Sequence, residues 1–182
     1  MELITHKDLV ELAYKWVLKR SGCGVAFKEL HTACCNGEFP DVIGFGSGTS
    51  TVVECKISRA DFLADAKKSF RKYPEMGMGQ FRYYCCPEGL INPEDLPQKW
   101  GLIYVKDGKC KVIVNPKTVK LLADGHHGYI GAHHERNIRA ENELMYSALR
   151  RLFIKGYMKH IYDKDYSSTA NTEELIALNE FL

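Results

Sequence analysis

One stretch, positions 38–58 with the sequence EFPDVIGFGSGTSTVVECKIS, restricts the fold of this chain more than any other. Two apolar runs flank a glycine- and serine-rich turn, a pattern that predicts two antiparallel strands joined as a hairpin. Successive side chains of a strand point to opposite faces, so the apolar residues of the second run are enough to form a core. The charges of Asp41, Glu54 and Lys56 are not needed for packing and indicate a function.

The position of the turn determines which residues face each other across this hairpin. Counting outward from Ser47 and Gly48 places Asp41 opposite Glu54. Directly opposed residues have Cβ atoms ~4.5–5.5 Å apart, and like charges in these positions repel. We therefore expect a positive charge between the two carboxylates. A bulge in the turn would shift the register by one residue, so the pairing is a prediction.

Two carboxylates and an amine on one patch predict a site for a divalent metal ion. Lys56 follows Glu54 by two residues and shares its face, while the Cys55 side chain points to the opposite, apolar side. Carboxylate oxygens suit Mg²⁺ or Mn²⁺, which complete their shell with water and substrate phosphate. The backbone carbonyl of Cys55 is a further candidate ligand. The alternative is that these are ordinary surface charges, because the spacing D-x(12)-E-x-K is common.

The chemistry that fits such a site is phosphodiester hydrolysis. Asp41 and Glu54 would hold the ion, which polarises the scissile phosphate and lowers the pKa of a bound water. Lys56 would orient the nucleophile or stabilise the charge that develops on the phosphoryl group. The three residues are therefore the candidate catalytic set.

The other periodicities of the sequence predict an α/β chain. Thr5 and Asp8 form a variant of the capping box before a helix that ends at Gly22 or Gly24. Ser58 and Asp61 begin a second helix in the same way. The predicted strands are 25–33, 40–46, 50–58, 80–86 and a hairpin within 101–116, and the later helices are 58–73 and 139–157. The order is α-β-β-β-α-β followed by a hairpin and a helix.

Length and composition favour one cytoplasmic domain. A chain of 182 residues can bury one sizeable core, and no linker divides it. We expect a single domain over 1–160 and an acidic tail over 161–182 that is loosely docked or partly disordered. No apolar run approaches the ~18–20 residues of a membrane span, and the first residues lack the order of a signal peptide. The seven cysteines are odd in number, which favours free thiols.

The sequence resembles the PD-(D/E)XK nuclease superfamily, whose signature corresponds to Pro40-Asp41 and Glu54-Cys55-Lys56 in this chain. The segments VVECKISRADFLADAKK, FRYYCCPEGL and LPQKWGLIYV are similar to the MmcB-like branch of bacterial DNA repair proteins and their phage-borne relatives. The likeness covers roughly residues 38–105. It implies a restriction-endonuclease-like αβββαβ core with a mixed central sheet flanked by helices, to which this chain adds the C-terminal hairpin and helix.

The resemblance also implies an activity. It indicates a Mg²⁺- or Mn²⁺-dependent deoxyribonuclease in DNA repair, recombination or phage genome handling, in a bacterial or phage-infected cell. Enzymes of this superfamily often take a further acidic ligand from the first helix, for which Glu11 is the candidate, with a solvated side chain as the alternative. Relatives sometimes place a polar residue near the metal at the position of Gln80. Many pair their subunits to cut two strands, so a homodimer is compatible with the resemblance.

The charge distribution suggests where DNA would bind. Net charge is only +2, but residues 56–72 are rich in lysine and arginine. Arg59 is a candidate for pairing with Asp61 or with a phosphate. Contacts to the DNA backbone, whether branched or single-stranded, would be made along the second helix without reading sequence. The further candidates for these contacts are Lys67, Lys68, Arg71 and Lys72. A solvated helix face is the alternative.

Two features leave other functions open. His126, His127, His133 and His134 lie in a glycine-rich segment that could bind Zn²⁺ or a phosphate, although an exposed surface loop or a DNA-contacting loop is favoured. The protein could also be a nucleic-acid-binding or regulatory protein that keeps the nuclease fold without cutting. The third alternative is a protein-interaction module of phage origin, whose aromatic residues and cysteines line a partner surface.

Overall fold

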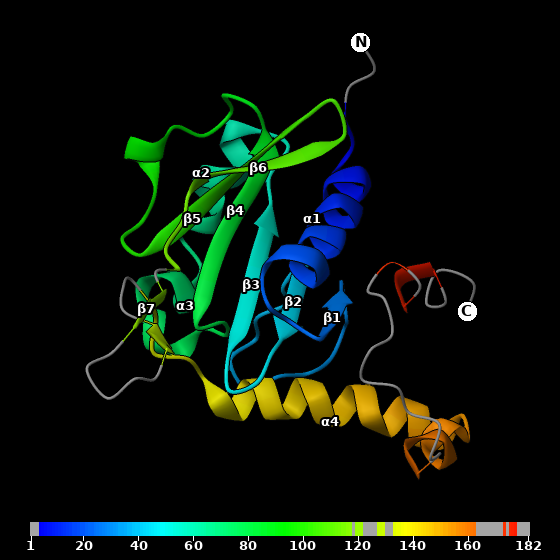
Figure 1. Ribbon diagram of the computed structural model, residues 1–182. Helices are drawn as coiled ribbons and strands as arrows, with labels where there is room; N and C mark the ends of the chain where they lie inside the picture. Colours follow the sequence, from blue (N-terminus) through cyan, green and yellow to red (C-terminus); the bar gives the residue numbers. More distant parts are fainter. Residues whose placement is uncertain are drawn as a thin grey trace.

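A six-stranded mixed sheet forms the centre of the protein (Figure 1). The computed structural model describes residues 4–117, 119–121, 127–129, 133–162, 173 and 175–177, with the backbone alone at 119–121 and 127–129. The strands follow in the order β1-β2-β3-β4-β5-β6, and β3-β4 and β4-β5 are the parallel pairs. Their bounds are Val25–Lys28, Val42–Phe45, Ser50–Cys55, Phe81–Pro87, Trp100–Lys106 and Lys109–Val114. The molecule is thus an α/β fold, as predicted.

Helices cover both faces of this sheet (Figure 1). Helix α1, His6–Arg20, packs on one face, and α2, Arg59–Asp65, packs on the other. The short α3, Ser69–Lys72, follows α2, and α4, Ile138–Ile154, runs along one end of the sheet. The remaining elements are the 3₁₀ turns Pro74–Met76, Pro93–Asp95 and Tyr157–Tyr162 and the paired strands β7, Val119–Leu121, and β8, His127–Tyr129.

The first helix begins at the predicted capping box. The Thr5 side chain accepts a hydrogen bond from the Asp8 N–H at 3.2 Å, and the Thr5 N–H donates to the Asp8 carboxylate at 2.9 Å. Two otherwise unpaired backbone groups are thereby satisfied. The buried stripe of α1, which includes Leu9, Ala13 and Val17, then covers strand residues of the core.

Replacing Thr5 by alanine should lower the free energy of unfolding by about 1 kcal/mol, because the N-terminal amides of α1 lose their side-chain acceptor. Urea denaturation followed by circular dichroism would measure the change. Thr5→Ser keeps the acceptor oxygen and should be nearly neutral. An equal loss in both variants would show that the cap is unimportant.

The hairpin that carries the charged residues has the predicted register. Val42 pairs with Val53 and Phe45 with Ser50, so the position before β2 faces the position of Glu54. The second predicted hairpin is also confirmed. Its turn residues Asp107 and Gly108 have φ angles of 48° and 69°, the left-handed pair that a two-residue hairpin requires.

Three predicted elements differ from the structure. The predicted strand 25–33 ends at Lys28. The predicted helix 58–73 is broken between α2 and α3, and Lys68 has the extended backbone angles φ −65° and ψ 142°. In a continuous helix Arg71 would point about 120° away from Asp65, whereas the break lets the two side chains pair. The predicted helix 139–157 ends at Ile154, and its Leu149 is 49% exposed because the second half of this helix extends beyond the sheet.

Two further predictions concern the ends of the chain. None of the helices in the described ranges has both the length and the apolar character needed to cross a membrane. Most of the predicted tail 161–182 lies outside the described residues. Within it, Ile176 is buried and Glu173 pairs with Lys19 of α1 at 2.8 Å.

Candidate functional site

The predicted catalytic residues meet on the face of the sheet that α2 covers. Glu54 belongs to β3, and Lys56 directly follows this strand. The Lys56 Nζ atom lies 3.4 Å from the Glu54 Oε2 atom, and both side chains are almost completely buried. The Cys55 side chain points to the opposite face and is fully buried in the core under α1, as predicted. The alternation of the strand therefore separates the polar chemistry from the apolar packing.

Arg71 is the central cation of this site. Its guanidinium donates to Glu38 at 2.6 Å and to Asp65 at 2.8 Å, and it lies 3.0 Å from the Glu54 Oε1 atom. The side chain is 4% exposed. We call Glu38, Glu54, Lys56, Asp65 and Arg71 the charged cluster. Arg71 therefore points inward and pairs with three carboxylates, whereas the sequence analysis predicts that it contacts DNA at the surface.

Other polar groups complete the charged cluster. Lys56 Nζ lies 3.5 Å from Asp65 Oδ1 and 3.8 Å from Asp61 Oδ1. Lys68 pairs with the same Asp65 oxygen at 2.7 Å, and the Tyr84 hydroxyl donates to Asp65 Oδ2 at 2.8 Å. These contacts hold the side chains of β3, β4 and the two short helices in one arrangement.

Asp41 lies at the edge of the charged cluster and is already engaged. Its Oδ2 atom accepts a hydrogen bond from the Cys55 N–H at 2.7 Å and lies 3.5 Å from His6 Nε2. The side chain is 18% exposed, which makes it more accessible than Glu54. Glu11, the expected ligand from the first helix, pairs with Lys28 at 2.5 Å. The Glu11 side chain is therefore directed toward Lys28 of β1 and forms an ion pair there.

The charges of this region do not balance. Five carboxylates, those of Glu38, Asp41, Glu54, Asp61 and Asp65, stand against three cations, Lys56, Lys68 and Arg71. Burial raises the pKa of Glu54 to about 7; Arg71 and Lys56 oppose this shift, while Asp41 and Asp65 add to it. Burial opposes the charge of Lys56, but Glu54 and Asp65 outweigh it and raise the pKa of this amine. With all five carboxylates ionised the region would carry two negative charges in excess, and the proton on Glu54 reduces this excess to one.

The raised pKa of Glu54 predicts a pH dependence of stability. Glu54 keeps a proton in the folded protein up to about pH 7, whereas the unfolded chain releases it near its ordinary pKa of 4.5. The folded state then binds more protons, so this residue's contribution to stability is present below pH 4.5 and is lost as the pH rises to about 7.

Glu54→Gln should abolish this slope. Urea unfolding at pH 4.5 and pH 7.5 should show that the wild type loses roughly 3 kcal/mol relative to the variant over this interval. Glu94→Gln, at an exposed position in the 3₁₀ turn Pro93–Asp95, is the control and should keep the wild-type slope. Parallel curves for wild type and Glu54→Gln would contradict the buried, partly protonated carboxyl.

The donor set fits a divalent cation in chemistry and in charge. Within the described ranges, no group of three or more His, Cys, Asp and Glu side chains is arranged to hold a metal ion. The candidate ligands Asp41 and Glu54 are nevertheless hard oxygen donors, and the two negative charges in excess when Glu54 is ionised would match a dication. Glu54 carries an unfavourable charge that a metal ion would relieve in place of a proton.

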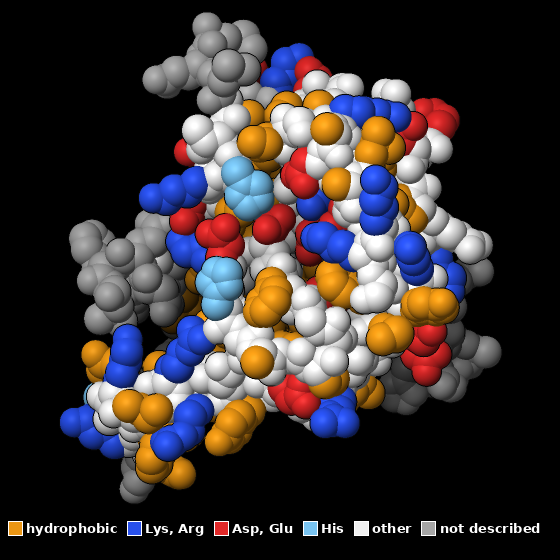
Figure 2. Space-filling model, turned by 180° about the vertical axis from the view of Figure 1, so that it is seen from behind, with side chains coloured by type: hydrophobic (Ala, Val, Ile, Leu, Met, Phe, Trp, Pro, Cys, Tyr) orange, Lys and Arg blue, Asp and Glu red, His pale blue; other side chains and the backbone are white. Residues whose placement is uncertain are grey.

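The predicted nucleic-acid-binding residues have different surroundings. Lys67 and Lys72 are exposed, and Lys68 reaches the surface while pairing with Asp65. Arg59 forms a bidentate ion pair with Asp95, in which one contact measures 2.7 Å. The predicted partner was Asp61 or a phosphate. On the face shown in Figure 2, acidic side chains lie next to histidine, lysine and arginine side chains. Lysine and arginine side chains on this face therefore lie among aspartate and glutamate side chains.

Gln80 lies apart from the charged cluster. Its N–H donates to the Ser50 hydroxyl at 3.1 Å, at the beginning of the parallel pair β3-β4. Glu54 pairs with Tyr84, four residues further along, which corresponds to about 13 Å along the strand. Ser50 in turn donates to the buried Glu141 of α4 at 2.7 Å. The structure thus groups Gln80 with α4 instead of with Asp41 and Glu54.

Sequence reasoning missed two members of the charged cluster, Glu38 and Asp65. Asp65 follows Asp61 by four residues on the same helix face, a spacing that could have indicated it. Glu38 lies in a loop with no local pattern. Its Oε2 atom accepts from the Met78 N–H at 2.6 Å, so only the tertiary structure reveals its position.

The prediction of an exposed histidine loop is wrong for His134. This residue is 5% exposed, and its ring packs edge-on against Trp100 with 6.2 Å between ring centroids. Its backbone N–H donates to the Gln80 carbonyl at 2.9 Å, so this end of the segment is held next to the start of β4. His127 lies in β8, His133 is exposed, and His126 lies outside the described residues.

Comparison with known proteins supports the fold alone. A solved structure of a protein of unknown function from Silicibacter pomeroyi superimposes with a TM-score of 0.52 and 23% sequence identity, over 91% of this chain and 100% of that one. No protein-family model and no curated protein matches the sequence. The chain therefore shares the architecture of a bacterial protein, and its function has to be argued from the site.

Proposed function

We propose that the protein is a Mg²⁺- or Mn²⁺-dependent nuclease that hydrolyses DNA phosphodiester bonds at Asp41, Glu54 and Lys56, on a restriction-endonuclease-like core. The observation that carries the proposal is the position of Lys56. Its amine is buried beside Glu54 and Asp65, on the face to which the hairpin register also brings Asp41. Buried titratable groups with shifted pKa values cluster at functional sites, so the Lys56 amine between carboxylates at a strand end favours a chemical role.

The residues of the site would divide the chemistry between them. Asp41 and Glu54 would hold the metal ion, which when bound polarises the scissile phosphate and activates water. Lys56 would orient the nucleophile or stabilise the charge that grows on the phosphoryl oxygens. Arg71 fixes the Glu54 carboxylate through its 3.0 Å contact and would position this ligand. Lys67 and Lys72 are exposed and would contact the DNA backbone.

A cleavage assay tests the proposal directly. The protein is incubated with supercoiled, linear, single-stranded and branched DNA in Mg²⁺, in Mn²⁺ and in chelator. Metal-dependent products that disappear in Asp41→Asn are expected. Asp107→Asn, in the turn between β5 and β6, is the matched control and should keep activity. Cleavage that continues in chelator, or no cleavage of any substrate, would contradict the proposal.

One observation favours a second function, a nucleic-acid-binding protein that does not cut. Both oxygens of Glu54 already face cations, Arg71 at 3.0 Å and Lys56 at 3.4 Å. The charged cluster could therefore serve as a structural ion-pair network. Salt-sensitive DNA binding without cleavage, together with no binding of Mn²⁺ in calorimetry, would support this second function.

A further inference from the structure

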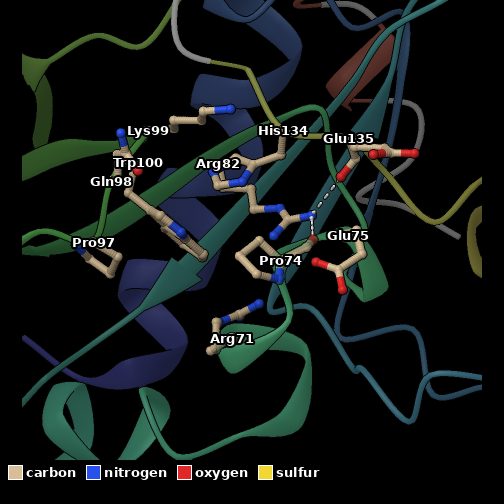
Figure 3. Close-up of a pocket in the computed structure, with 10 residues that line it drawn as sticks. All are labelled: Arg71, Pro74, Glu75, Arg82, Pro97, Gln98, Lys99, Trp100, His134 and Glu135. Carbon is tan, nitrogen blue, oxygen red and sulfur yellow. Dashed lines mark hydrogen bonds between the residues drawn. The ribbon is translucent and has the colours of Figure 1, made fainter.

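A pocket of about 310 Å³ adjoins the charged cluster (Figure 3). Its lining comes from four segments: the end of α3 with the following turn, β4, residues 97–100 that lead into β5, and residues 134–135. Arg71 belongs to both sites, because its guanidinium contacts Glu54 on one side and lies 4.8 Å from the Trp100 ring centroid on the other. The pocket is thus a direct neighbour of the proposed catalytic residues.

The most buried charge in this pocket is Arg82. The residue is 0% exposed, and its guanidinium donates to the carbonyls of Gly79, Pro74 and Gly77 at 3.0, 2.7 and 2.9 Å. Throughout the part of the chain that the structure describes, no carboxylate lies within 4.0 Å of it. Burial lowers its pKa to about 10, with Glu38 and Glu141 opposing the shift from a distance. A buried cation without a counter-ion is unfavourable, and an anion in the pocket would correct this.

Two other lining residues supply donors that could face an anion. His134 is 5% exposed, and its Nε2 atom is buried without a hydrogen-bond partner. Lys99 is exposed, and its φ angle of 69° lies in the left-handed region that residues other than glycine rarely adopt. The surrounding structure holds Lys99 in this conformation at the pocket. In Figure 3 His134 lies between Lys99 and Arg82, and the Arg82 guanidinium points toward Pro74 and Glu135.

We propose that this pocket binds the phosphate group of a phosphate monoester, presented by the end of a nucleic-acid strand or by a mononucleotide. Lys99 and His134 provide the polar contacts, the buried Arg82 adds positive charge without direct contact, and Trp100 forms an apolar wall. Glu75 and Glu135 are exposed and lie on the side of Arg82 away from Trp100 (Figure 3). Their charges would repel a continuing phosphodiester chain, so the pocket suits a terminal phosphate. The assignment of this phosphate to a DNA end deepens, and rests on, the proposed nuclease function.

Binding measurements in chelator test this site independently of cleavage. A fluorescent oligonucleotide is compared with 5′-phosphate, 3′-phosphate and hydroxyl ends, with inorganic phosphate and AMP as competitors. We expect about tenfold tighter binding of one phosphorylated end, reversed by inorganic phosphate. Lys99→Gln and His134→Gln should lose this preference, whereas Lys109→Gln, at an exposed position on β6, should keep it. Lys99 is exposed, so its variant should fold even if His134→Gln does not.

The outcomes separate the pocket from the catalytic proposal. Preference for a phosphorylated end, together with no products in the cleavage assay with Mg²⁺ or Mn²⁺, would support the pocket and contradict the nuclease. Binding of AMP and inorganic phosphate but of neither oligonucleotide end would assign the pocket to free phosphate esters. Equal binding of all ends with no competition by either phosphate compound, or a preference that Lys99→Gln leaves intact, would overturn the inference.

Discussion

Replacing Lys56 by methionine is expected to lower metal-dependent DNA cleavage by about 10²–10³-fold. The amine lies 3.4 Å from Glu54 and 3.5 Å from Asp65, within the buried face of the hairpin. Methionine keeps most of the side-chain volume but removes the charge that would stabilise the transition state. The effect should appear in kcat, with little change in DNA affinity, because the buried amine is 5% exposed and is not part of the outer surface.

Lys68→Met is the matched control for this experiment. Lys68 contacts the same Asp65 oxygen at 2.7 Å but is 45% exposed, so its removal should change cleavage by no more than a few-fold. Circular dichroism melting curves would show that both variants are folded at the assay temperature. Wild-type cleavage by Lys56→Met, or equal losses in the two variants, would rule out the assigned role of Lys56.

Replacing Arg71 by methionine is expected to lower the free energy of unfolding by about 3–5 kcal/mol. The guanidinium contacts Glu38, Glu54 and Asp65, all almost completely buried, and its removal leaves these carboxylates repelling one another. Urea denaturation measures the loss. The midpoint should recover at low pH, because protonation removes the repulsion between the uncompensated carboxylates.

The neighbouring residue provides the control for Arg71. Lys72→Met, at an exposed position, should change stability by no more than about 0.5 kcal/mol. This pair of variants also separates the two roles considered for Arg71. A small stability loss combined with weaker DNA binding and a reduced salt dependence would favour the phosphate contact expected from the sequence over the ion-pair role.

Local patterns predicted the elements that depend on neighbouring residues. The capping box at Thr5, the Asp107-Gly108 turn and the register of the first hairpin are confirmed, because each is set by a few adjacent side chains and backbone angles. The alternation that separates Cys55 from Glu54 and Lys56 follows from the strand itself. The positions of these candidate site residues on one face were therefore predictable.

The sequence could not show how the second helix divides. Residues 58–73 have helical periodicity throughout, yet the chain breaks before α3 and turns Arg71 toward Asp65. Arg71 forms ion pairs with carboxylates from a loop, a strand and a helix, and these ion pairs favour the break. Helical periodicity within residues 58–73 does not reveal them. The same holds for the inward position of His134, which depends on its packing against Trp100.

By itself, the sequence determined that two acids and an amine lie on one side of a hairpin, because a strand with a fixed turn has only one alternation. Only the tertiary structure decided which charges balance them. Glu38 lies 33 residues before Arg71, and Asp65 meets Arg71 only because the helix breaks between them. Each buried carboxylate is stabilised by a cation that the fold brings next to it. The pocket around Arg82 arises in the same way, where four segments meet and leave one buried cation without a carboxylate within ion-pair distance among the described residues.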